Sequence, residues 1–491
     1  MNGYDAISCS MEAEIMKKKH KLIIVGGGAS GMLAAIVAAR QGIDTALLEA
    51  NELPGKKILA TGNGKCNFTN RVQREDCYRG EQPEVAMQLL VRYPVERILE
   101  FFTELGIVPK ERNGYYYPYS EQAASVREAL ELTLSALPVT IYTNCHAEAV
   151  QKEKNGFRIQ AQQRMLLSAD GFSKGNAKNG KKASKPAKPV FSEPFPVEFS
   201  AEYLILATGG QAGNIKGADG SGYTLAAALG HQVITPVPAL VQLKAANPEC
   251  AELAGVRQEA AATLRVGEKH YQEQGEFLFT EYGISGIPIL QLSRYAACAL
   301  LRKEKVQNVK LYLDFFPQTT ENSLQKQIEA RFLNFPERTN LQKLTGLLPS
   351  KLNAVLLKRV GMRSEAKETL QTEQGQKIAK RLVTELKHFE LEITGTNSFE
   401  NAQVTAGGVP LAELAAETME SRRCEHLYII GELADIDGTC GGYNLQWAWM
   451  SAFAAADAIV AASKVAQNRE ARIGEHRDKS KSAEITHNAY R

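Results

Sequence analysis

Residues 21–50, KLIIVGGGASGMLAAIVAARQGIDTALLEA, constrain the fold more than any other stretch of the chain. The apolar run 21–25 predicts a buried parallel strand. The following glycines fit G-x-G-x-x-G, and the small apolar residues 32–40 predict a helix packed closely on a sheet. A second predicted strand, 45–48, ends at Glu49. This order of strand, glycine turn, helix, strand and acid predicts a Rossmann-type α/β domain.

The motif glycines and the acid have separate physical roles in such a domain. Gly26 permits the tight turn, Gly28 lets the backbone approach a pyrophosphate, and Gly31 lets helix and strand pack closely. The pyrophosphate would sit on free N–H groups at the positive end of the helix. Glu49 is placed to accept hydrogen bonds from the adenosine ribose. The segment predicts a site for FAD or NAD and does not distinguish the two.

The next segment, residues 51–70, is rich in glycine, lysine and small polar residues, which suits a loop around a charged, flat ligand. Lys56, Lys57 and Lys65 could neutralise a diphosphate. Cys66 and Asn67 could meet the edge of a ring. A solvated surface loop with a chance cysteine explains the same composition.

Composition excludes several classes of function. The 491 residues suffice for roughly three domains, and a net charge of +3 gives no reason to expect nucleic acid or anionic lipid as a partner. No uninterrupted apolar run approaches the ~20 residues of a membrane span. Eight cysteines without C-x-x-C pairs are typical of a reduced, cytoplasmic protein, and no His/Cys cluster has metal-ligand spacing.

Changes of pattern along the chain predict an FAD- or NAD-binding domain interrupted by an insert. Residues 162–196 are rich in Lys, Gly, Ser and Pro, which favours a disordered hairpin extension. Their lysine-rich run has no interleaved aromatic residues to stack bases, which disfavours a nucleic-acid arm. The expected parts are a flexible leader at 1–20, the first part of the dinucleotide-binding domain at 21–240, a β-rich substrate domain at 241–316, a helical subdomain at 317–387, a return strand at 388–404, the second part of the dinucleotide-binding domain at 405–463 and a flexible tail at 464–491.

Two later glycine-rich turns follow predicted strands. Thr208, Gly209 and Gly210 would bring bare backbone close to the cofactor. Gly431 and Glu432 lie at the carboxyl end of a strand, where open α/β sheets bind ligands.

Several blocks resemble one flavoprotein family. The segment GKKILATGNGKCNFTN after GGGASGMLAAIVAARQG, the aromatic-Pro-x-Ser segment 114–120, the ATGG turn, the block 279–286 and GELADIDG followed by GGYNLQ are similar to the BaiN/RdsA-type (YhiN-like) NAD(P)/FAD-dependent oxidoreductases. That family includes an aminoacetone oxidase. The resemblance covers roughly residues 21–460.

The resemblance implies an α/β fold of the two-dinucleotide-binding-domain flavoprotein superfamily, with non-covalent FAD. Glu432 and Asp435 are then candidates to bind the ribityl chain. The N–H groups that follow Gly442, at Asn444 and Leu445, would face the flavin N1/C2=O edge. Ala147 would lie near the adenine. The candidate cofactor-binding residues are Gly26, Gly28, Ala29, Ser30, Gly31, Glu49, Ala50, Lys56, Lys57, Gly64, Lys65, Cys66, Asn67, Ala147, Thr208, Gly209, Gly210, Gly431, Glu432, Asp435, Gly442, Asn444 and Leu445.

The implied activity is hydride transfer through flavin N5 between NAD(P)H and a small organic substrate. Only one convincing Rossmann fingerprint is present, so NAD(P)H would dock transiently. Two alternatives remain open: an oxygen-using FAD amine oxidase and a non-catalytic flavin-binding redox sensor. No catalytic acid or base is assigned; the aromatic residues 115–117, Tyr443 and His231 are candidates that a structural role explains as well. Oligomeric state is left open, and no metal is expected.

Overall fold

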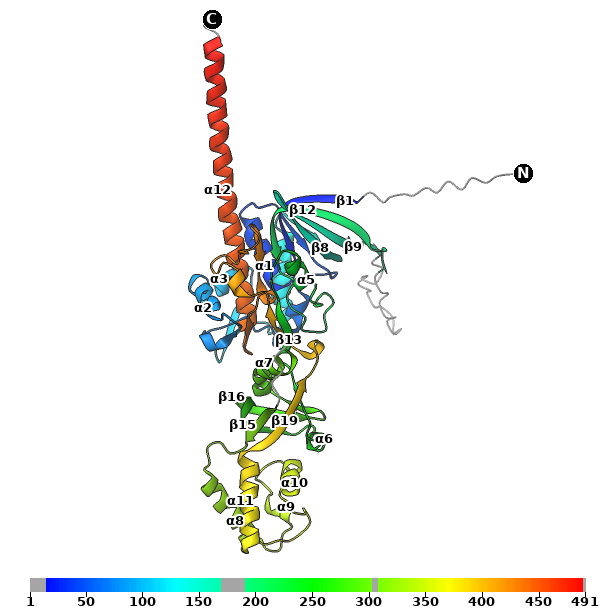
Figure 1. The fold of residues 1–491 in the computed structure, drawn as a ribbon, viewed down its shortest axis with the longest axis vertical. Helices are drawn as coiled ribbons and strands as arrows, with labels where there is room; N and C mark the ends of the chain where they lie inside the picture. The colour runs from blue at the N-terminus through cyan, green and yellow to red at the C-terminus, as the bar shows by residue number, and fades with distance from the viewer. Residues whose placement is uncertain (1–14, 169–189, 303–307, 489–491) are drawn as a thin grey trace, which may run out of the picture.

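The computed structural model describes residues 15–168, 190–302 and 308–488, with side chains up to residue 467. The chain forms an upper α/β body and a lower body that continues into a group of helices (Figure 1). The last helix leaves the upper body as a long rod (Figure 1).

A seven-stranded sheet organises the upper body, in the order β7-β2-β1-β12-β9-β8, with β21 also paired to β12. The first strands are parallel, whereas β9 runs antiparallel to β12 and to β8. Every residue of β2 is buried, as expected for a parallel strand covered on both faces. The strands are β1 (Met16–Val25), β2 (Thr45–Leu48), β7 (Val139–Tyr142), β8 (Cys145–Glu153), β9 (Gly156–Gln163), β12 (Phe195–Leu206) and β21 (Leu427–Ile429).

Two helices that are far apart in the sequence pack together against this sheet. They are α1 (Ala29–Arg40) and the first part of α12 (Tyr443–Asn488). Trp447 and Trp449 of α12 are buried, and their indole N–H groups donate to the carbonyls of Gly431 and Phe68, both at 2.9 Å. These bonds fix α12 to the strand ends on which the site is built.

The lower body is a closed six-stranded barrel capped by helices. Its strands are β14 (Leu243–Ala245), β15 (Arg257–Val266), β16 (Lys269–Thr280), β17 (Gly283–Ser285), β18 (Val309–Asp314) and β19 (Phe389–Thr396). Its helices are α6 (Glu249–Leu253), α7 (Ile287–Leu301), α8 (Glu321–Asn334), α9 (Asn340–Lys343), α10 (Ser350–Arg359) and α11 (Glu373–Lys387). The antiparallel pair β13 (Ile234–Ala239) and β20 (Val404–Gly408) links the two bodies.

Shorter elements complete the upper body. Its remaining strands are β3 (Thr69–Asn70), β4 (Tyr78–Arg79), β5 (Pro109–Arg112), β6 (Tyr115–Pro118), β10 (Leu166–Ser168), β11 (Val190–Phe191) and β22 (Asp437–Gly438). Its remaining helices are α2 (Glu84–Arg92), α3 (Val95–Glu104), α4 (Ala123–Ser135) and α5 (Ser221–Ala228), with short 3-10 segments η1 (Lys56–Gly64), η2 (Glu75–Cys77), η3 (Phe399–Asn401), η4 (Leu411–Glu413) and η5 (Gly431–Leu433).

Both ends of the chain differ from the sequence-based expectation. The leader expected at 1–20 already contains the start of β1, because Met16 to His20 pair in parallel with Val197 to Ala201 of β12. Residues 1–14 lie outside the described part. The flexible tail expected at 464–491 continues α12 as far as Asn488. Lys, Glu, Gln, Arg and Ala dominate much of this segment and favour a helix even without an apolar face.

One internal expectation also needs correction. The strand expected to return the chain to the sheet, 388–404, contains β19, which closes the barrel against β14 and β18. The chain rejoins the central sheet only at β21. In the extension expected at 162–196, β10 and β11 pair antiparallel, and residues 169–189 lie outside the described part.

One described helical segment, Tyr443–Gln467 of α12, is long and apolar enough to cross a membrane. Of its most apolar window, 67% is buried inside the protein. Core helices of soluble proteins meet the same criterion, so the packing against α1 accounts for its composition.

Candidate functional site

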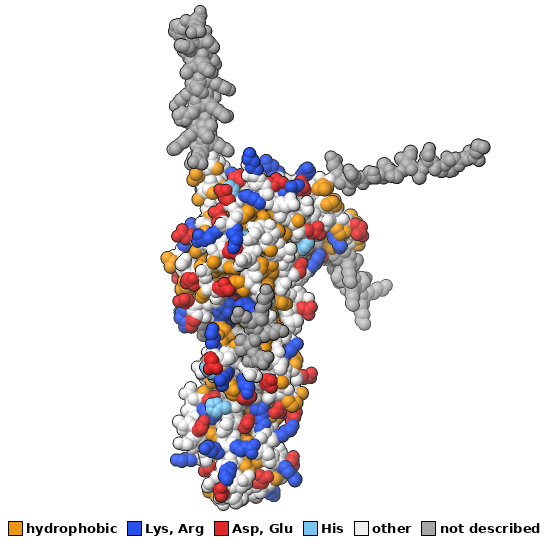
Figure 2. Space-filling model, in the orientation of Figure 1, with side chains coloured by type: hydrophobic (Ala, Val, Ile, Leu, Met, Phe, Trp, Pro, Cys, Tyr) orange, Lys and Arg blue, Asp and Glu red, His pale blue; other side chains and the backbone are white. Residues whose placement is uncertain are grey.

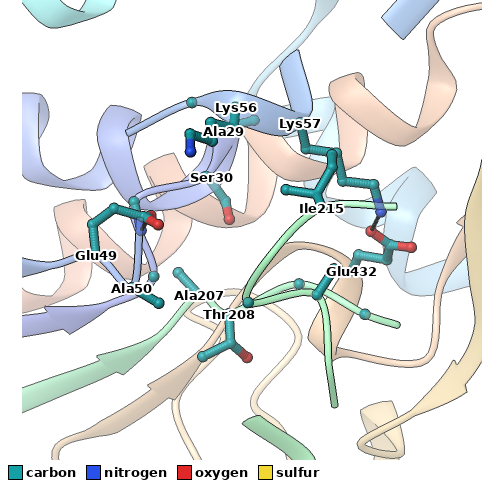
Figure 3. A pocket seen from close by; sticks show the side chains of 18 of the residues that line it. Ala29, Ser30, Glu49, Ala50, Lys56, Lys57, Ala207, Thr208, Ile215 and Glu432 are labelled. Carbon is teal, nitrogen blue, oxygen red and sulfur yellow. Dashed lines mark hydrogen bonds and ion pairs between the residues drawn. The ribbon is translucent and has the colours of Figure 1, made fainter. Parts of the chain in front are cut away.

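A cavity opens at the carboxyl ends of β1, β2 and β12, which is where open α/β sheets bind ligands. Fifteen candidate residues line it: Gly26, Gly28, Ala29, Ser30, Glu49, Ala50, Lys56, Lys57, Ala147, Thr208, Gly209, Gly210, Glu432, Asn444 and Leu445. Figure 3 shows several of them around the open space, with Ser30 and Glu49 on one side and Lys57 and Glu432 on another.

The glycine turn at the start of α1 provides the diphosphate end of the cavity. Gly26 has φ +106°, and a Cβ there would lie 2.4 Å from the Ala207 carbonyl oxygen. A Cβ at Gly31 would lie 1.9 Å from the Gly26 oxygen, so this glycine serves helix packing and does not line the cavity. A Cβ at Gly28 would meet no protein atom within 4 Å. Gly28 thus borders space that a ligand can fill.

The first turn of α1 has no capping side chain and no acidic residue. Its N–H groups and the helix dipole therefore face the cavity without a protein anion. This end of the helix fits a diphosphate.

The buried carboxylate of Glu49 provides the ribose end. Its Oε2 accepts a hydrogen bond from the Gly27 N–H at 2.9 Å, and its Oε1 accepts from the Asn51 N–H at 2.7 Å and Nδ2 at 2.6 Å. These bonds hold both oxygens at the cavity wall, and Oε2, which accepts only one of them, keeps acceptor capacity. Ala147 and His146 line the adjoining wall.

An ion pair forms part of one wall of the cavity (Figure 3). Lys57 Nζ lies 2.6 Å from Glu432 Oε2, and Glu432 Oε1 accepts from the Thr405 N–H at 2.7 Å. Nearby, the buried hydroxyl of Thr208 has no hydrogen-bond partner among the described residues. This hydroxyl is enclosed against Gly222 of α5, so it faces the protein and not the open cavity.

The far end of the cavity is formed by the start of α12. Asn444 and Leu445 line it together with Ile436 and Trp447. The Asn444 amide holds the Gly438 backbone, accepting at 2.8 Å and donating at 2.9 Å. The first turn of α12 carries no acidic residue, so its positive end suits the electron-rich edge of a flavin.

Eight predicted residues do not line the cavity: Gly31, Gly64, Lys65, Cys66, Asn67, Gly431, Asp435 and Gly442. Lys65 pairs with Glu121 at 2.9 Å. Hydrogen bonds from Lys110 and then Lys65 lower the pKa of Glu121 to about 2. Asp435 Oδ2 accepts from the Glu81 N–H at 2.9 Å, so this carboxylate holds a neighbouring loop. The sequence shows an acid after the strand but not the direction in which its side chain points.

Cys66 is fully buried in the core of the upper body and does not meet a ring edge in the cavity. Burial raises the pKa of its thiol to about 12, so the group stays protonated at neutral pH. Its φ of +56° shows that the position serves the sharp return of the loop.

We therefore expect Cys66→Ser to keep bound flavin and most of the rate of flavin reduction, because a similar small side chain fits the position. Cys66→Leu should lose both through crowding of the core. Flavin absorbance per protein and stopped-flow bleaching measure these outcomes. A serine variant with normal flavin content but a turnover reduced about a hundredfold would assign the thiol a chemical role.

Sequence reasoning missed part of the lining. Asn51 bonds to Glu49 and to the Lys216 carbonyl, and Ile215 and Ser221 line the same wall. The glycine-rich segment 217–222 was the sequence signal that could have pointed to this wall, although it does not form a second dinucleotide fingerprint.

The residues considered as a catalytic acid or base occupy structural positions. His231 is buried between Glu413 at 2.7 Å and Ser421 at 2.8 Å, and burial lowers its pKa. Burial raises the pKa of Tyr443, and Tyr115 packs beside Gly441. None of these three lines the cavity. Within the described residues, no group of three or more His, Cys, Asp or Glu side chains could hold a metal ion.

The chain is similar to known proteins along most of its length. Residues 20–172 match the HI0933-like protein Rossmann domain, and residues 237–404 match the HI0933-like protein barrel and H2TH domain. The chain is 40% identical over 440 residues to a 3-dehydro-bile acid delta(4,6)-reductase of Clostridium scindens, covering 89% of this chain and 98% of the relative. It is 28% identical over 443 residues to a ribosomal RNA dihydrouridine synthase of Escherichia coli, covering 90% and 98%.

A solved structure of Escherichia coli quinol fumarate reductase matches at a TM-score of 0.45 and 14% identity, covering 94% of this chain and 74% of that one. The family domains confirm the predicted fold class, a Rossmann-type domain interrupted by a β-rich and helical insert. The chain belongs to the HI0933-like family and is an FAD-dependent oxidoreductase.

Proposed function

We propose that this protein is an NAD(P)H-linked reductase of a small organic compound, with FAD held in the cavity between α1 and α12. The observation that carries the proposal is the 40% identity, over nearly the whole chain, to a reductase of a 3-oxo bile acid with ring double bonds. The favoured substrate class is therefore an apolar compound with a carbon–carbon double bond conjugated to a carbonyl. Bound FAD would supply the hydride chemistry.

The residues of the chain would hold and orient the cofactor. The start of α1 would bind the diphosphate, Glu49 the adenosine ribose, and Glu432 the ribityl chain. The start of α12 would face the pyrimidine edge of the ring. Ile436, Leu445 and Trp447 would keep this end of the cavity apolar and exclude water.

The relatives named ribosomal RNA dihydrouridine synthases do not lead to an RNA substrate here. Their identity to this chain is lower, at 27–28%. On the face shown in Figure 2, basic and acidic side chains are interspersed and form no continuous basic stripe. RNA binding relies on concentrated positive charge, so the face in view gives no support for it.

The first test is the state of the cofactor. We expect FAD to copurify and to be released by acid precipitation, because no His or Cys side chain lines the middle or the ring end of the cavity. Absorbance of the supernatant after precipitation measures the released flavin. Colour retained in the pellet would contradict non-covalent binding, and a colourless native protein would contradict the cofactor assignment.

The same preparation distinguishes the reductase from its alternatives. Under anaerobic conditions, NADH or NADPH should bleach the flavin in a stopped-flow experiment, and an enone should restore its colour. Bleaching by an amine alone, followed by reoxidation with oxygen, would identify an amine oxidase. Bleaching by none of these donors at a useful rate would favour a redox sensor.

A further inference from the structure

A short segment between β12 and α5 forms part of one wall of the cavity. This wall segment, residues 214–219, begins after Gly213, whose N–H donates to the Phe399 carbonyl at 2.9 Å, and ends before Gly220, the N-cap of α5. It contains no helix or strand. Figure 3 shows its Ile215 bordering the same open space as Glu49. The cavity-lining residues of the wall segment are Ile215, Lys216, Gly217 and Ala218.

One hydrogen bond ties the wall segment to the end of β2. Asn51 Nδ2 donates to the Lys216 carbonyl at 2.9 Å. Among the described residues, the other hydrogen bonds of the wall segment stay within it or reach the residues that flank it. A Cβ at Gly217 would lie 3.3 Å from Ala50 Cβ and 3.6 Å from Asn51 Nδ2, so the segment also packs against this end of β2. The position of the wall segment therefore depends on Asn51.

The same amide holds the carboxylate that we assign to the adenosine ribose. Asn51 Nδ2 donates to Glu49 Oε1 at 2.6 Å, and this oxygen also accepts from the Asn51 N–H at 2.7 Å. A hydrogen bond to a carboxylate is stronger than one between neutral groups. Both protons of the amide are thereby used, one on Glu49 and one on the Lys216 carbonyl. Asn51 is 6% exposed and lines the cavity, so one buried side chain fixes two parts of its wall.

We propose that Asn51 is a positioning residue that retains FAD by fixing Glu49 and the wall segment at the adenosine end of the cavity. The inference rests on the proposed cofactor site and adds how release of the cofactor is controlled. Glu49 Oε2 stays in place for a ribose hydroxyl while Asn51 holds Oε1. The wall segment stays closed on this end while Asn51 holds the Lys216 carbonyl, so loss of the amide speeds dissociation of FAD.

The test is the rate at which FAD leaves the purified holoenzyme, followed by flavin fluorescence after dilution. Asn51→Ala removes both hydrogen bonds of the amide. It should speed release about tenfold or more, because one of these bonds is made to a charged group. The measurement needs no electron donor, so its result is independent of whether NAD(P)H bleaches the flavin. A wild-type protein without FAD would contradict the cofactor site itself.

Asn51→Asp separates positioning from packing, because it keeps the shape of the side chain and places a second carboxylate beside Glu49. Two carboxylates this close share a proton as the pH falls, which restores a hydrogen bond to Glu49. Relative to the wild type at the same pH, release from Asn51→Asp should therefore slow between about pH 9 and about pH 5. Asn51→Ala gains no proton and should keep a constant ratio. The comparison with the wild type at each pH accounts for the other titratable side chains of the cavity wall and the wall segment, which are Lys56, Lys57, Cys145, His146, Lys216, Asp219 and Glu432.

Asn353→Ala is the matched control. Asn353 is 1% exposed, and its Nδ2 donates to the Leu344 and Leu348 carbonyls, at 3.0 and 2.8 Å, among the helices of the lower body. This change should lower the melting temperature and leave FAD release unchanged. An unchanged release rate in Asn51→Ala, an equal increase in Asn353→Ala, or a constant rate ratio across pH in Asn51→Asp would overturn the proposal.

Discussion

Gly28→Val should yield a folded protein without bound flavin. Gly28 has φ −76° and ψ −167°, an extended conformation that valine adopts readily, and no protein atom lies within 4 Å of a Cβ at this position. The branched side chain would instead fill the space in which we place the diphosphate. The loss of an N-cap glycine at the start of α1 should cost only about 1 kcal/mol. Flavin absorbance per protein and the melting temperature measure the two effects.

Two further glycines separate a binding effect from a folding effect. A Cβ at Gly395, in the barrel, also meets no atom within 4 Å, so Gly395→Val should keep both flavin and fold. Gly31→Ala should destabilise the protein, because its Cβ would lie 1.9 Å from the Gly26 carbonyl oxygen. Full flavin occupancy in Gly28→Val would show that this turn does not hold the diphosphate.

The predicted residues that line the cavity are those whose positions follow from local geometry. A strand that ends in Gly26 and continues into a helix leaves little choice for where Ser30 and Glu49 lie, and both line the cavity. The ends of β12 and β21 follow from the same rule, because parallel strands end at one edge of a sheet.

The predicted residues that do not line the cavity are placed elsewhere by backbone conformations that the composition does not reveal. In the loop after Glu49, Asn63 and Cys66 have positive φ values, which turn the chain so that Cys66 enters the core. Asp435 points to Glu81 because of a loop far away in the sequence.

The start of β1 and the end of α12 also could not be predicted from the pattern of apolar residues. The first residues of β1 are polar, but their ladder with β12 is made by the backbone, which leaves no periodicity in the side chains. α12 continues beyond its buried part because its later residues have high helix propensity. Both misassignments arose from treating the absence of an apolar pattern as the absence of structure.

The largest loss of stability outside the cavity is expected from Arg294→Leu. Asp437 is 1% exposed and receives both of its short hydrogen bonds from Arg294, so the change leaves a buried carboxylate unpaired. Breaking such a pair typically costs about 3–5 kcal/mol. Urea unfolding followed by tryptophan fluorescence measures it, because both tryptophans of the chain lie in α12, which packs against β22, the strand of Asp437.

The control and the pH dependence identify the cause. Lys358→Leu breaks an exposed pair with Glu252 and should cost less than about 1 kcal/mol. Arg294→Leu combined with Asp437→Leu should recover much of the loss, since no charge then stays buried. A double variant as unstable as Arg294→Leu alone would show that the pair acts through packing.

The sign of the pH effect follows from the buried acid. Burial already raises the pKa of Asp437 above its ordinary value, and Arg294 works against that rise. Without Arg294 the pKa of the folded state rises further, so the folded protein holds its proton more tightly than the unfolded chain does. The stability deficit of Arg294→Leu should therefore grow as pH rises above about 4 and shrink on acidification towards that value. A deficit independent of pH would mean that the buried charge of Asp437 is not what Arg294 neutralises at the junction of the two bodies.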